Sequence, residues 1–345
     1  MPPASSARRA ALALLLTLPA WALAAKPRKT GPSYARHPAA EAFAAEVAAR
    51  HNLPKAWILA QLAQARRLDA VRQLIMPPAA GSPKNWAAYR ARFIEPRRIG
   101  AGLSFWRDNE TWLDAAHQRW GVPPQIVVGI IGVETFYGRI TGSLRVIDSL
   151  ATLAFDFPTG RSDRSAFFRT ELEEFLVMCR RERIDPLGIK GSYAGAMGLA
   201  QFMPSSVNRH AVDMDDDGHI DLHRSAADAI GSVAHYLAQF GWQRDLPTHF
   251  EVTPPPHGAE RTTLLGPDIV PTFSAADLVE HGAVLGEGAR AHAGPLALVE
   301  LQNGDAEPSH IAGTQNFYTL TRYNWSSYYA LAVIELGEAV QRARQ

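Results

Sequence analysis

The stretch IVVGIIGVETFYGR, from Ile126 to Arg139, decides the fold of this chain. Its first eight residues carry no polar side chain, and a carboxylic acid, Glu134, follows them directly. Prolines before the run and Gly138 after it are typical of the start and end of a helix. Gly129 and Gly132 each weaken that helix by about 0.5–1 kcal/mol relative to alanine, which is tolerable where another backbone passes close by. The stretch predicts a central, buried helix that ends near Gly138, with Glu134 at its C-terminal end.

The predicted position of Glu134 disfavours its ionised form in two ways. Apolar neighbours remove solvation, and the C-terminal end of a helix carries partial negative charge, so both raise the pKa of the carboxyl. A carboxylic acid that keeps its proton near neutral pH can act as a general acid. The structural alternative is a glutamate paired with Arg139 or Arg145. This stretch alone does not decide between the two interpretations.

A glycosidase of the usual kind places two carboxyl groups across the bond it cleaves. No other acid stands in a setting like that of Glu134. Asp148 is predicted to cap a helix and Asp156 to lie in a turn. Three further acids are predicted to lie on a solvated helix face: Glu171, Glu173 and Glu174. The sequence therefore predicts one acid group without a partner carboxylate.

The composition excludes some classes of function. With 345 residues and 47% hydrophobic content, the chain is long enough to bury a sizeable core. Lys and Arg number 35 against 34 Asp and Glu, so no strongly basic surface argues for a nucleic-acid partner. The only cysteine, Cys179, excludes an intramolecular disulfide, and we expect it to be a small buried hydrophobe rather than a reactive thiol.

The N-terminus has the layout of a secretory signal peptide. Arg8 and Arg9 precede a short apolar run, and Ala22 and Ala24 are small residues where a signal peptidase cleaves. The alternative, a membrane anchor, would need an apolar stretch of about 20 residues, and this run is shorter. No cysteine lies near the cleavage site, so we expect no lipid anchor and a soluble periplasmic protein. The predicted segments are a signal peptide over residues 1–24 and a linker over residues 25–36.

Helical patterns dominate from residue 38 to about residue 242. The composition then shifts, because residues 247–312 hold TPPPHG, LLGPDIVP and EHGAVLGEG together with short extended runs such as LALVEL. The last segment, SSYYALAVIELGEAVQRA, is again helical in pattern. The sequence predicts a mainly α fold with a small irregular or β-containing insertion over about residues 247–312.

A glycine-rich segment, KGSYAGAMGLAQFMPSS, runs from Lys190 to Ser206. Its glycines permit a backbone that lies close to a ligand or to a neighbouring helix. Gln201 is a neutral donor and acceptor between apolar residues, which suits the hydroxyl or N-acetyl groups of a sugar. The alternative is a tight connection between helices in which Gln201 caps backbone groups. No Gly-Lys-Ser/Thr follows the glycines, so a phosphate-binding loop is not expected.

A second polar and aromatic segment, NFYTLTRYNWSSYY, lies near the C-terminus. Sugar sites combine flat apolar rings with fixed polar atoms, and this segment supplies both. Core packing with an Asn or Ser helix cap is the simpler interpretation if the segment is considered alone. The groups concerned are Tyr318, Tyr323, Asn324, Trp325 and Tyr328.

The segment DMDDDGHIDLHR, which begins at Asp213, has the spacing of a calcium loop. Gly218 holds the position of the sharp turn, but position 12 is Arg224 where the motif has a glutamate. Hard carboxylate oxygens favour Ca²⁺ over zinc or copper, and we expect a structural ion rather than an Asp-rich turn without metal. The predicted calcium loop spans residues 213–228, and its candidate ligands are Asp213, Asp215, Asp217, His219, Asp221 and Asp228.

Four segments together resemble the B-type membrane-bound lytic murein transglycosylases: VPPQIVVGIIGVETFYGR, KGSYAGAMGLAQFMPSS, DGHIDL with ADAIGSVAHYL, and NFYTLTRYN. The resemblance runs from about residue 36 to residue 343. It implies a lysozyme-like α+β core with an additional helical region and a small β-containing part, and a catalytic region over residues 37–345. It also implies cleavage of the β-1,4 bond between N-acetylmuramic acid and N-acetylglucosamine without water.

The resemblance implies that Glu134 is the single catalytic acid and base, which agrees with the missing second carboxylate. The product would be a 1,6-anhydro sugar, and the N-acetyl group of the substrate would assist. The calcium loop is a feature of the family as well. The implied sugar contacts are Ser192, Gln201, Phe202, Tyr236, Tyr323, Asn324 and Tyr328.

Two other functions stay open on the sequence alone. One is a hydrolytic muramidase of the lysozyme type, and the other is a non-catalytic, Ca²⁺-dependent glycan-binding module. The expected partner is the peptidoglycan strand, and cell-wall synthases are candidate protein partners that the sequence does not name. We expect no organic cofactor and no nucleic-acid partner.

Overall fold

The structure is a computed structural model that describes residues 31–77 and 84–345. The predicted signal peptide and the first half of the predicted linker, residues 25–30, lie outside the described residues. The described chain divides into two compact units. We call them the loop unit, formed by residues 31–77 and 134–232, and the sheet unit, formed by residues 84–133 and 233–345. No helix in these ranges is long and apolar enough to cross a membrane.

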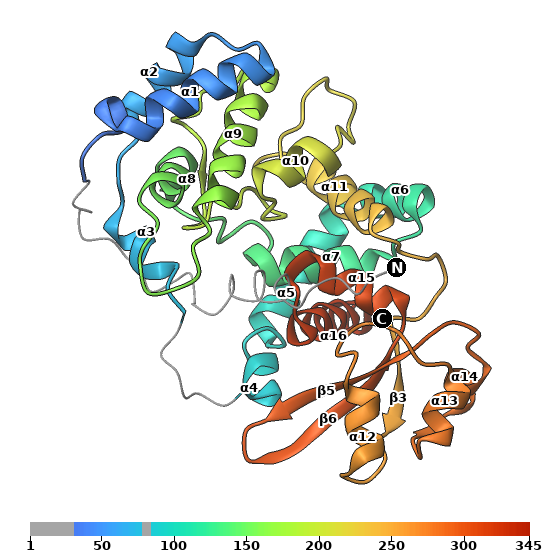
Figure 1. Ribbon diagram of the computed structural model, residues 1–345. Coiled ribbons are helices and arrows are strands. Elements are labelled where there is room, and N and C mark those ends of the chain that lie inside the picture. Colours follow the sequence, from blue (N-terminus) through green and yellow to red (C-terminus); the bar gives the residue numbers. More distant parts are fainter. Residues whose placement is uncertain (1–30, 78–83) are drawn as a thin grey trace. The chain divides into compact units, whose positions relative to one another are not determined.

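The loop unit is helical, apart from two short strands that pair antiparallel (Figure 1). Helix α8 lies against α9, and α1 lies against α2. Its elements are η3 (Tyr34–Arg36), α1 (Pro38–His51), α2 (Lys55–Gln64), α3 (Asp69–Leu74), β1 (Leu144–Arg145), α8 (Val146–Phe155), α9 (Ser165–Glu182), β2 (Lys190–Gly191) and α10 (Pro204–His210).

The sheet unit combines helices with a four-stranded antiparallel sheet in the order β4-β3-β6-β5. The boundary between the units falls near the end of α7 and within α11. The helices before and after the sheet are α4 (Trp86–Ala91), α5 (Pro96–Asp108), α6 (Glu110–Trp120), α7 (Pro124–Thr135), α11 (Ala226–Gln239), α15 (Gln315–Asn324) and α16 (Ser327–Ala343). The insertion holds β3 (His249–Thr253), α12 (Ala259–Leu265), α13 (Ala275–Glu280), β4 (Val284–Leu285), α14 (Glu287–Ala291), β5 (Ala297–Asn303) and β6 (Ala306–Gly313).

The insertion has its own small core, which explains why its composition differs from that of the helical part. Leu264, Leu278 and Leu298 are completely buried in one apolar cluster between the short helices and one face of the sheet. A sheet with one buried face needs only alternate residues to be apolar. The prediction of a mainly α fold with a small β-containing part is confirmed.

Helix α7 is the buried helix that the opening stretch predicts. Every residue from Ile126 to Val133 is buried. A methyl group on Gly129 would lie 2.2 Å from the carbonyl oxygen of Val333, and one on Gly337 would lie 1.9 Å from that of Gln125. The glycines therefore allow the backbones of α7 and α16 to touch, which is the close approach that offsets their low helix propensity.

The helix ends at Thr135 and not near Gly138, so the predicted end was wrong by about one turn. The reason is the backbone of the next three residues, because Phe136, Tyr137 and Gly138 have φ of 52°, 57° and 83°. A right-handed helix cannot continue through left-handed conformations. Cys179 is buried as predicted, and burial raises the pKa of its thiol.

The contact between α7 and α16 gives a stability prediction. Gly337→Ala places a methyl group against the backbone of α7 and should destabilise the protein by about 1–3 kcal/mol. Gly100→Ala is the matched control, because Gly100 lies in α5 and a methyl group there meets nothing within 4 Å. That control should stabilise by up to about 1 kcal/mol. Urea unfolding measures both, and equal midpoints for the two variants would contradict the close contact.

Candidate functional site

Glu134 lies in the last turn of α7 and is half-buried. The left-handed residues Phe136 and Tyr137 follow almost at once. Such a conformation is unfavourable for bulky side chains and persists only where the surrounding structure imposes it. The chain is thus forced to reverse directly after the acid.

Thr135 fixes this turn to the glycine-rich segment. Its buried hydroxyl donates to the carbonyl of Leu199 at 3.0 Å and accepts from the N–H of Gly138 at 3.0 Å. The N–H of Ile140 donates to the Thr135 carbonyl at 2.9 Å. The neighbour of Glu134 is therefore bonded both within its own turn and across to the glycine-rich segment.

The two cations that the sequence offered as structural partners for Glu134 have other contacts. Arg145 forms two hydrogen bonds of 2.8 Å to the carboxylate of Asp148. The guanidinium of Arg139 lies 4.9 Å from the ring centre of Phe136. Asp148 is the third residue of α8 rather than its N-cap, and it also accepts from the N–H of Arg66 at 2.9 Å. The predicted capping role of Asp148 was therefore wrong.

The glycine-rich segment is a tightly folded loop. Met197 forms backbone bridges to Gly191 and to Phe202, so the segment doubles back on itself. A methyl group on Gly198, whose φ is 68°, would lie 2.3 Å from the carbonyl oxygen of Leu222. Only glycine fits both this conformation and this contact. We call residues 190–203 the glycine loop.

Ser192 and Gln201 are half-buried on the glycine loop, whereas Phe202 is buried. The Ser192 Oγ accepts from the N–H groups of Ala194 at 3.3 Å and Ala196 at 3.0 Å. Its own hydroxyl hydrogen stays available for an acceptor.

Gln201 has a positive φ of 49°, and its Nε2 donates to the carbonyls of Gly198 at 2.9 Å and Thr141 at 3.2 Å. The amide nitrogen thus binds backbone, as in the structural alternative. Within the described ranges its Oε1 accepts no hydrogen bond, so this acceptor is open to a ligand.

Four predicted sugar contacts lie in the sheet unit. The Tyr236 hydroxyl donates to the carbonyl of Arg322 at 2.9 Å, and burial raises the pKa of Tyr236 to about 12. Its ring contacts the ring of Tyr323 edge to face, with centres 5.1 Å apart. Asn324 is the buried last residue of α15. The Tyr328 hydroxyl donates to the carbonyl of Gln302 at 3.1 Å, and burial raises the pKa of this tyrosine.

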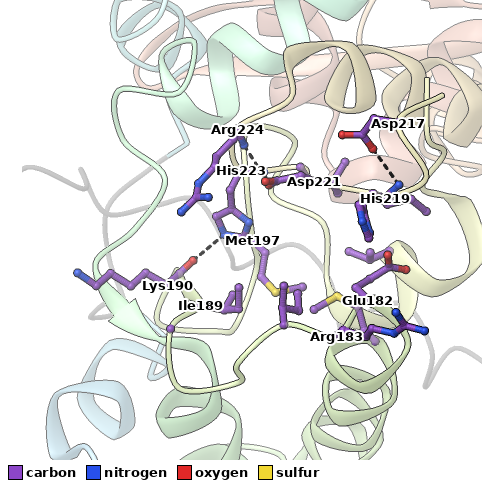
Figure 2. Close-up of a pocket in the computed structure, with 16 residues that line it drawn as sticks. Glu182, Arg183, Ile189, Lys190, Met197, Asp217, His219, Asp221, His223 and Arg224 are labelled. Carbon is purple, nitrogen blue, oxygen red and sulfur yellow. Dashed lines mark hydrogen bonds between the residues drawn. The ribbon is translucent and has the colours of Figure 1, made fainter. Parts of the chain in front are cut away.

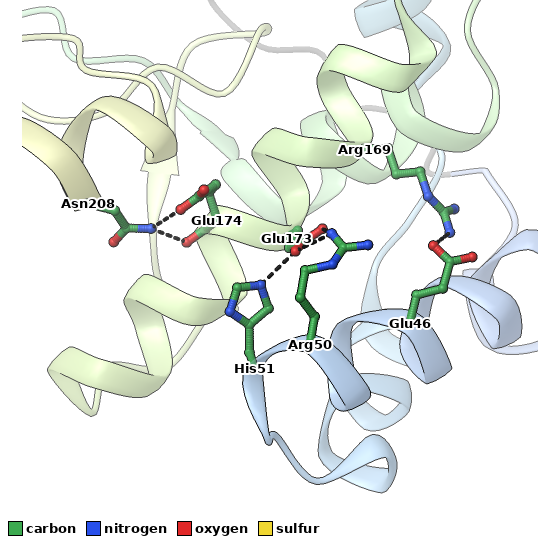
Figure 3. Close-up of polar contacts among 7 residues, drawn as sticks. All are labelled: Glu46, Arg50, His51, Arg169, Glu173, Glu174 and Asn208. Atoms are coloured by element: carbon green, nitrogen blue, oxygen red, sulfur yellow. Dashed lines mark hydrogen bonds and ion pairs between the residues drawn. The ribbon is translucent and has the colours of Figure 1, made fainter.

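The three glutamates on α9 are not a solvated face, so that expectation was wrong. Glu171 is 3% exposed and accepts from the N–H of Ser205 at 2.9 Å and from its hydroxyl at 2.7 Å. Glu173 pairs at 2.6 Å with both Arg50 and His51 of α1 (Figure 3). Glu174 accepts from Asn208 of α10 at 2.6 Å. The sequence periodicity of α9 does not predict that side chains of α1 and α10 pair with its glutamates.

Three aspartates of the predicted calcium loop come together. Carboxylate oxygens of Asp213, Asp215 and Asp228 lie within 4.8 Å of one another. Asp228 is 1% exposed, and its two oxygens accept from the N–H groups of Met214 and Asp221 at 2.8 Å each. Burial raises the pKa of Asp228, and the nearby Asp213 and Asp215 add to this effect.

The other predicted ligands lie outside this group of three. Asp217 Oδ1 accepts from the backbone N–H of His219 at 2.8 Å. Asp221 Oδ1 accepts from the N–H groups of His223 at 2.9 Å and Arg224 at 3.1 Å. Their carboxylates shape the loop in the structure.

A family model described as the transglycosylase SLT domain matches residues 35–338. Membrane-bound lytic murein transglycosylase B of Escherichia coli K12 is 39% identical over 326 residues, which cover 91% of this chain and 86% of that protein.

Solved structures agree with this match. The Escherichia coli lytic transglycosylase Slt35 in complex with calcium has a TM-score of 0.80 at 40% identity, covering 91% of this chain and 96% of that one. Catenated SltB1 from Pseudomonas aeruginosa has a TM-score of 0.82 at 38% identity, covering 91% and 100%. SltB3 from Pseudomonas aeruginosa in complex with NAG-NAM-pentapeptide has a TM-score of 0.74 at 27% identity, covering 90% and 80%.

The buried Glu171 gives a pH prediction. Burial raises its native pKa above the ordinary value of about 4.3, although its bonds to Ser205 oppose the shift. Its contribution to stability is therefore full below the ordinary pKa and is lost as the pH rises through the raised native pKa. The difference in melting temperature between wild type and Glu171→Gln should fall as the pH rises from about 4 towards neutral.

Glu46→Gln is the control for this measurement and has the opposite sign. Arg169 lowers the pKa of the exposed Glu46, so its contribution appears above the ordinary pKa and is lost as the pH falls. A Glu171→Gln difference that does not change with pH would contradict the burial argument.

Proposed function

The chain belongs to the lytic murein transglycosylases of the SLT domain family, and we propose that Glu134 is the one catalytic acid and base of this enzyme. Family membership also establishes the lysozyme-like fold and peptidoglycan glycan strands as the substrate. The residue roles and the mechanism below are our proposals.

The proposal rests on the observation that the other candidate carboxylates already form hydrogen bonds or ion pairs. A hydrolase of the two-carboxylate kind needs a second group to activate water or to attack the sugar. Each acid that the sequence offered for this role has a partner of its own: Asp148 with Arg145, Asp156 with the Tyr34 hydroxyl, Glu171 with Ser205, Glu173 with Arg50 and Glu174 with Asn208. One acid that works alone favours a lyase over a hydrolytic muramidase.

The proposed reaction uses the same proton twice. Glu134 donates its proton to the glycosidic oxygen while the bond from that oxygen to C1 of the muramic acid breaks. The N-acetyl oxygen of the same sugar stabilises C1. The Glu134 carboxylate then accepts the proton of the 6-hydroxyl while O6 forms its bond to C1, which gives the 1,6-anhydro ring and restores the acid. No water is consumed.

The side chains proposed to bind the glycan are those of Ser192, Gln201, Phe202, Tyr236, Tyr323, Asn324 and Tyr328. The open Oε1 of Gln201 and the free hydrogen of Ser192 suit sugar N–H, hydroxyl or carbonyl groups, and the buried Phe202 would fix the loop beneath them. The amide of Asn324 and the rings of Tyr323 and Tyr328 are the proposed polar and apolar contacts, and the ring of Tyr236 packs against that of Tyr323. A binding module without catalysis is disfavoured, because the family to which the chain belongs is one of enzymes.

We also propose a structural calcium ion in the loop of residues 213–228. The fit rests on Asp215, whose Oδ1 is buried and accepts no hydrogen bond from any residue of the described ranges. Buried carboxylate oxygens normally have a partner, and a hard cation beside Asp213 and Asp228 would supply one. Calcium takes six to eight oxygens, so Asp217, Asp221 and the carbonyl of His219 are the proposed further ligands. The related Slt35 was solved with calcium.

Export to the periplasm through the predicted signal peptide over residues 1–24 fits an enzyme that acts on the cell wall. An association with cell-wall synthases stays a prediction that follows from the shared polymer.

The catalytic proposal is tested with Glu134→Gln, which keeps the shape of the side chain and removes its proton. Release of muropeptides from purified sacculi should fall by at least about 100-fold, because general acid–base catalysis contributes about 10²–10⁴-fold. Wild-type products should end in muramic acid that is one water lighter by mass than a hydrolysed end.

Glu46→Gln, an exposed acid of the loop unit, is the matched control and should keep full activity. Activity of Glu134→Gln close to that of wild type would overturn the assignment, and hydrated ends from the wild type would point to a muramidase.

The calcium proposal is tested by thermal unfolding with and without a chelator. An ion at a hundredfold excess over its Kd adds about 2.7 kcal/mol, so chelation should lower Tm by a few degrees. Asp228→Asn should remove this calcium-dependent shift, whereas Asp216→Asn, on the same loop but outside the group of three, should keep it. A Tm that is the same with calcium and chelator would refute the site.

A further inference from the structure

A pocket of about 840 Å³ opens in the loop unit (Figure 2). The end of α9, the strand β2, the glycine loop and the predicted calcium loop line it. Its volume lies in the range of about 300–1,000 Å³ that is typical of sites for small ligands. None of the proposed sugar contacts and none of the three clustered aspartates lines it, although the proposed further calcium ligands Asp217, His219 and Asp221 do. We call it the loop-unit pocket.

The inner wall of this pocket is apolar. Met178 from α9, Met197 from the glycine loop and Val207 from α10 meet Leu222 there, and all four are buried. Two methionines make such a wall adaptable in shape. The wall therefore suits small apolar side chains of varied shape.

One end of the pocket rim carries two cations, Lys190 and Arg224, beside His223. Figure 2 shows Lys190, His223 and Arg224 gathered at one end of the pocket. Lys190 and Arg224 are exposed and form no ion pair with any residue of the described ranges. A ligand carboxylate placed between them would gain charge-assisted hydrogen bonds.

The opposite end of the pocket carries groups of both charges, because Glu182 and Arg183 lie there in Figure 2. Asp217 and His219 lie there in Figure 2, and Asp221 lies between the two ends. The carboxylates of Asp217 and Asp221 are proposed calcium ligands, so the acceptor at this end is Glu182, whose Oε1 accepts from the Arg181 Nε at 2.6 Å. Cations at one end and groups of both charges at the other match a short peptide, which carries N–H donors, carbonyl acceptors and a carboxylate.

We propose that the loop-unit pocket binds a short acidic peptide, with a free carboxylate between Lys190 and Arg224 and a small apolar side chain against the methionine wall. This inference rests on the proposed function in one respect, because the acidic peptides that the enzyme meets are those of the wall polymer. Hydrogen bonds of the glycine loop connect the pocket to the proposed sugar contacts Ser192 and Gln201 on the same loop. The His223 Nε2 lies 3.0 Å from the Lys190 carbonyl, and the Leu199 N–H donates to the Leu222 carbonyl at 2.8 Å.

The test uses peptides without sugar, released from purified sacculi by an amidase and titrated into the full chain by calorimetry with calcium present throughout. We expect saturable binding of one peptide per chain. The double variant Lys190→Met and Arg224→Met keeps the apolar stems but removes both charges, and it should weaken binding at least tenfold. Methionine is chosen because glutamate at position 224 would add a ligand at position 12 of the calcium loop.

Arg36→Met is the matched control, because this exposed cation of the loop unit lies outside the pocket and should leave binding unchanged. If the double variant melts below the wild type, the single variants, each expected to weaken binding severalfold, replace it. No saturable binding by the wild type, or equal binding by wild type and double variant, overturns the proposal. Binding to phosphatidylglycerol vesicles in place of peptides overturns it as well.

The outcome separates this inference from the proposed function. Glu134→Gln should bind the peptides as tightly as the wild type does, because they contain no glycosidic bond. If the wild type cleaves sacculi and loses activity in Glu134→Gln but binds no peptide, only the pocket proposal fails. If peptides bind while Glu134→Gln stays active, only the catalytic assignment fails.

Discussion

The contact between the backbones of α7 and α16 is the constraint on which the rest depends. Gly129 faces the carbonyl of Val333, and Gly337 faces the carbonyl of Gln125, with no room for a methyl group at either place. Two helices in such contact cannot slide or rotate without a steric clash, because interiors are packed as densely as crystals. The axis of α7 is thus fixed, and with it the point at which Glu134 leaves the apolar run.

A second constraint acts where that helix ends. Two bulky residues, Phe136 and Tyr137, adopt left-handed conformations that are unfavourable for them. The bonds of Thr135 to Leu199 and Gly138 help to offset this cost. The same hydroxyl therefore ties the turn after the acid to the glycine loop, which carries Ser192 and Gln201. Backbone strain of this kind is common at functional sites whose geometry must be fixed.

Two sets of carboxylates in the loop unit differ in the kind of partner they have. Asp148, Glu171 and Glu173 lie buried with a guanidinium, a hydroxyl or an imidazole, and such groups hold helices together. Asp213, Asp215 and Asp228 face one another instead, an arrangement that is unfavourable without a cation. Glu134, half-buried at the end of α7, is the acid that we propose for proton transfer. The acids that have structural partners are therefore not needed for the single-acid chemistry that we propose.

The sequence by itself determined the buried helix around Glu134, the glycine loop, the presence of a small β-containing part and the aspartates that gather near Asp228. Each of these follows from a pattern within a few residues: apolar runs, glycine spacing or ligand spacing. Only the tertiary structure decided the roles of Asp148, Glu171 and Glu173. Asp148 accepts from Arg66, Glu171 from Ser205 and Glu173 from Arg50, which lie 82, 34 and 123 residues away in the chain, although Asp148 also pairs with the nearby Arg145. A local pattern cannot report a partner at that distance, because burial of a polar group is set by the element that packs over it and not by its own helix.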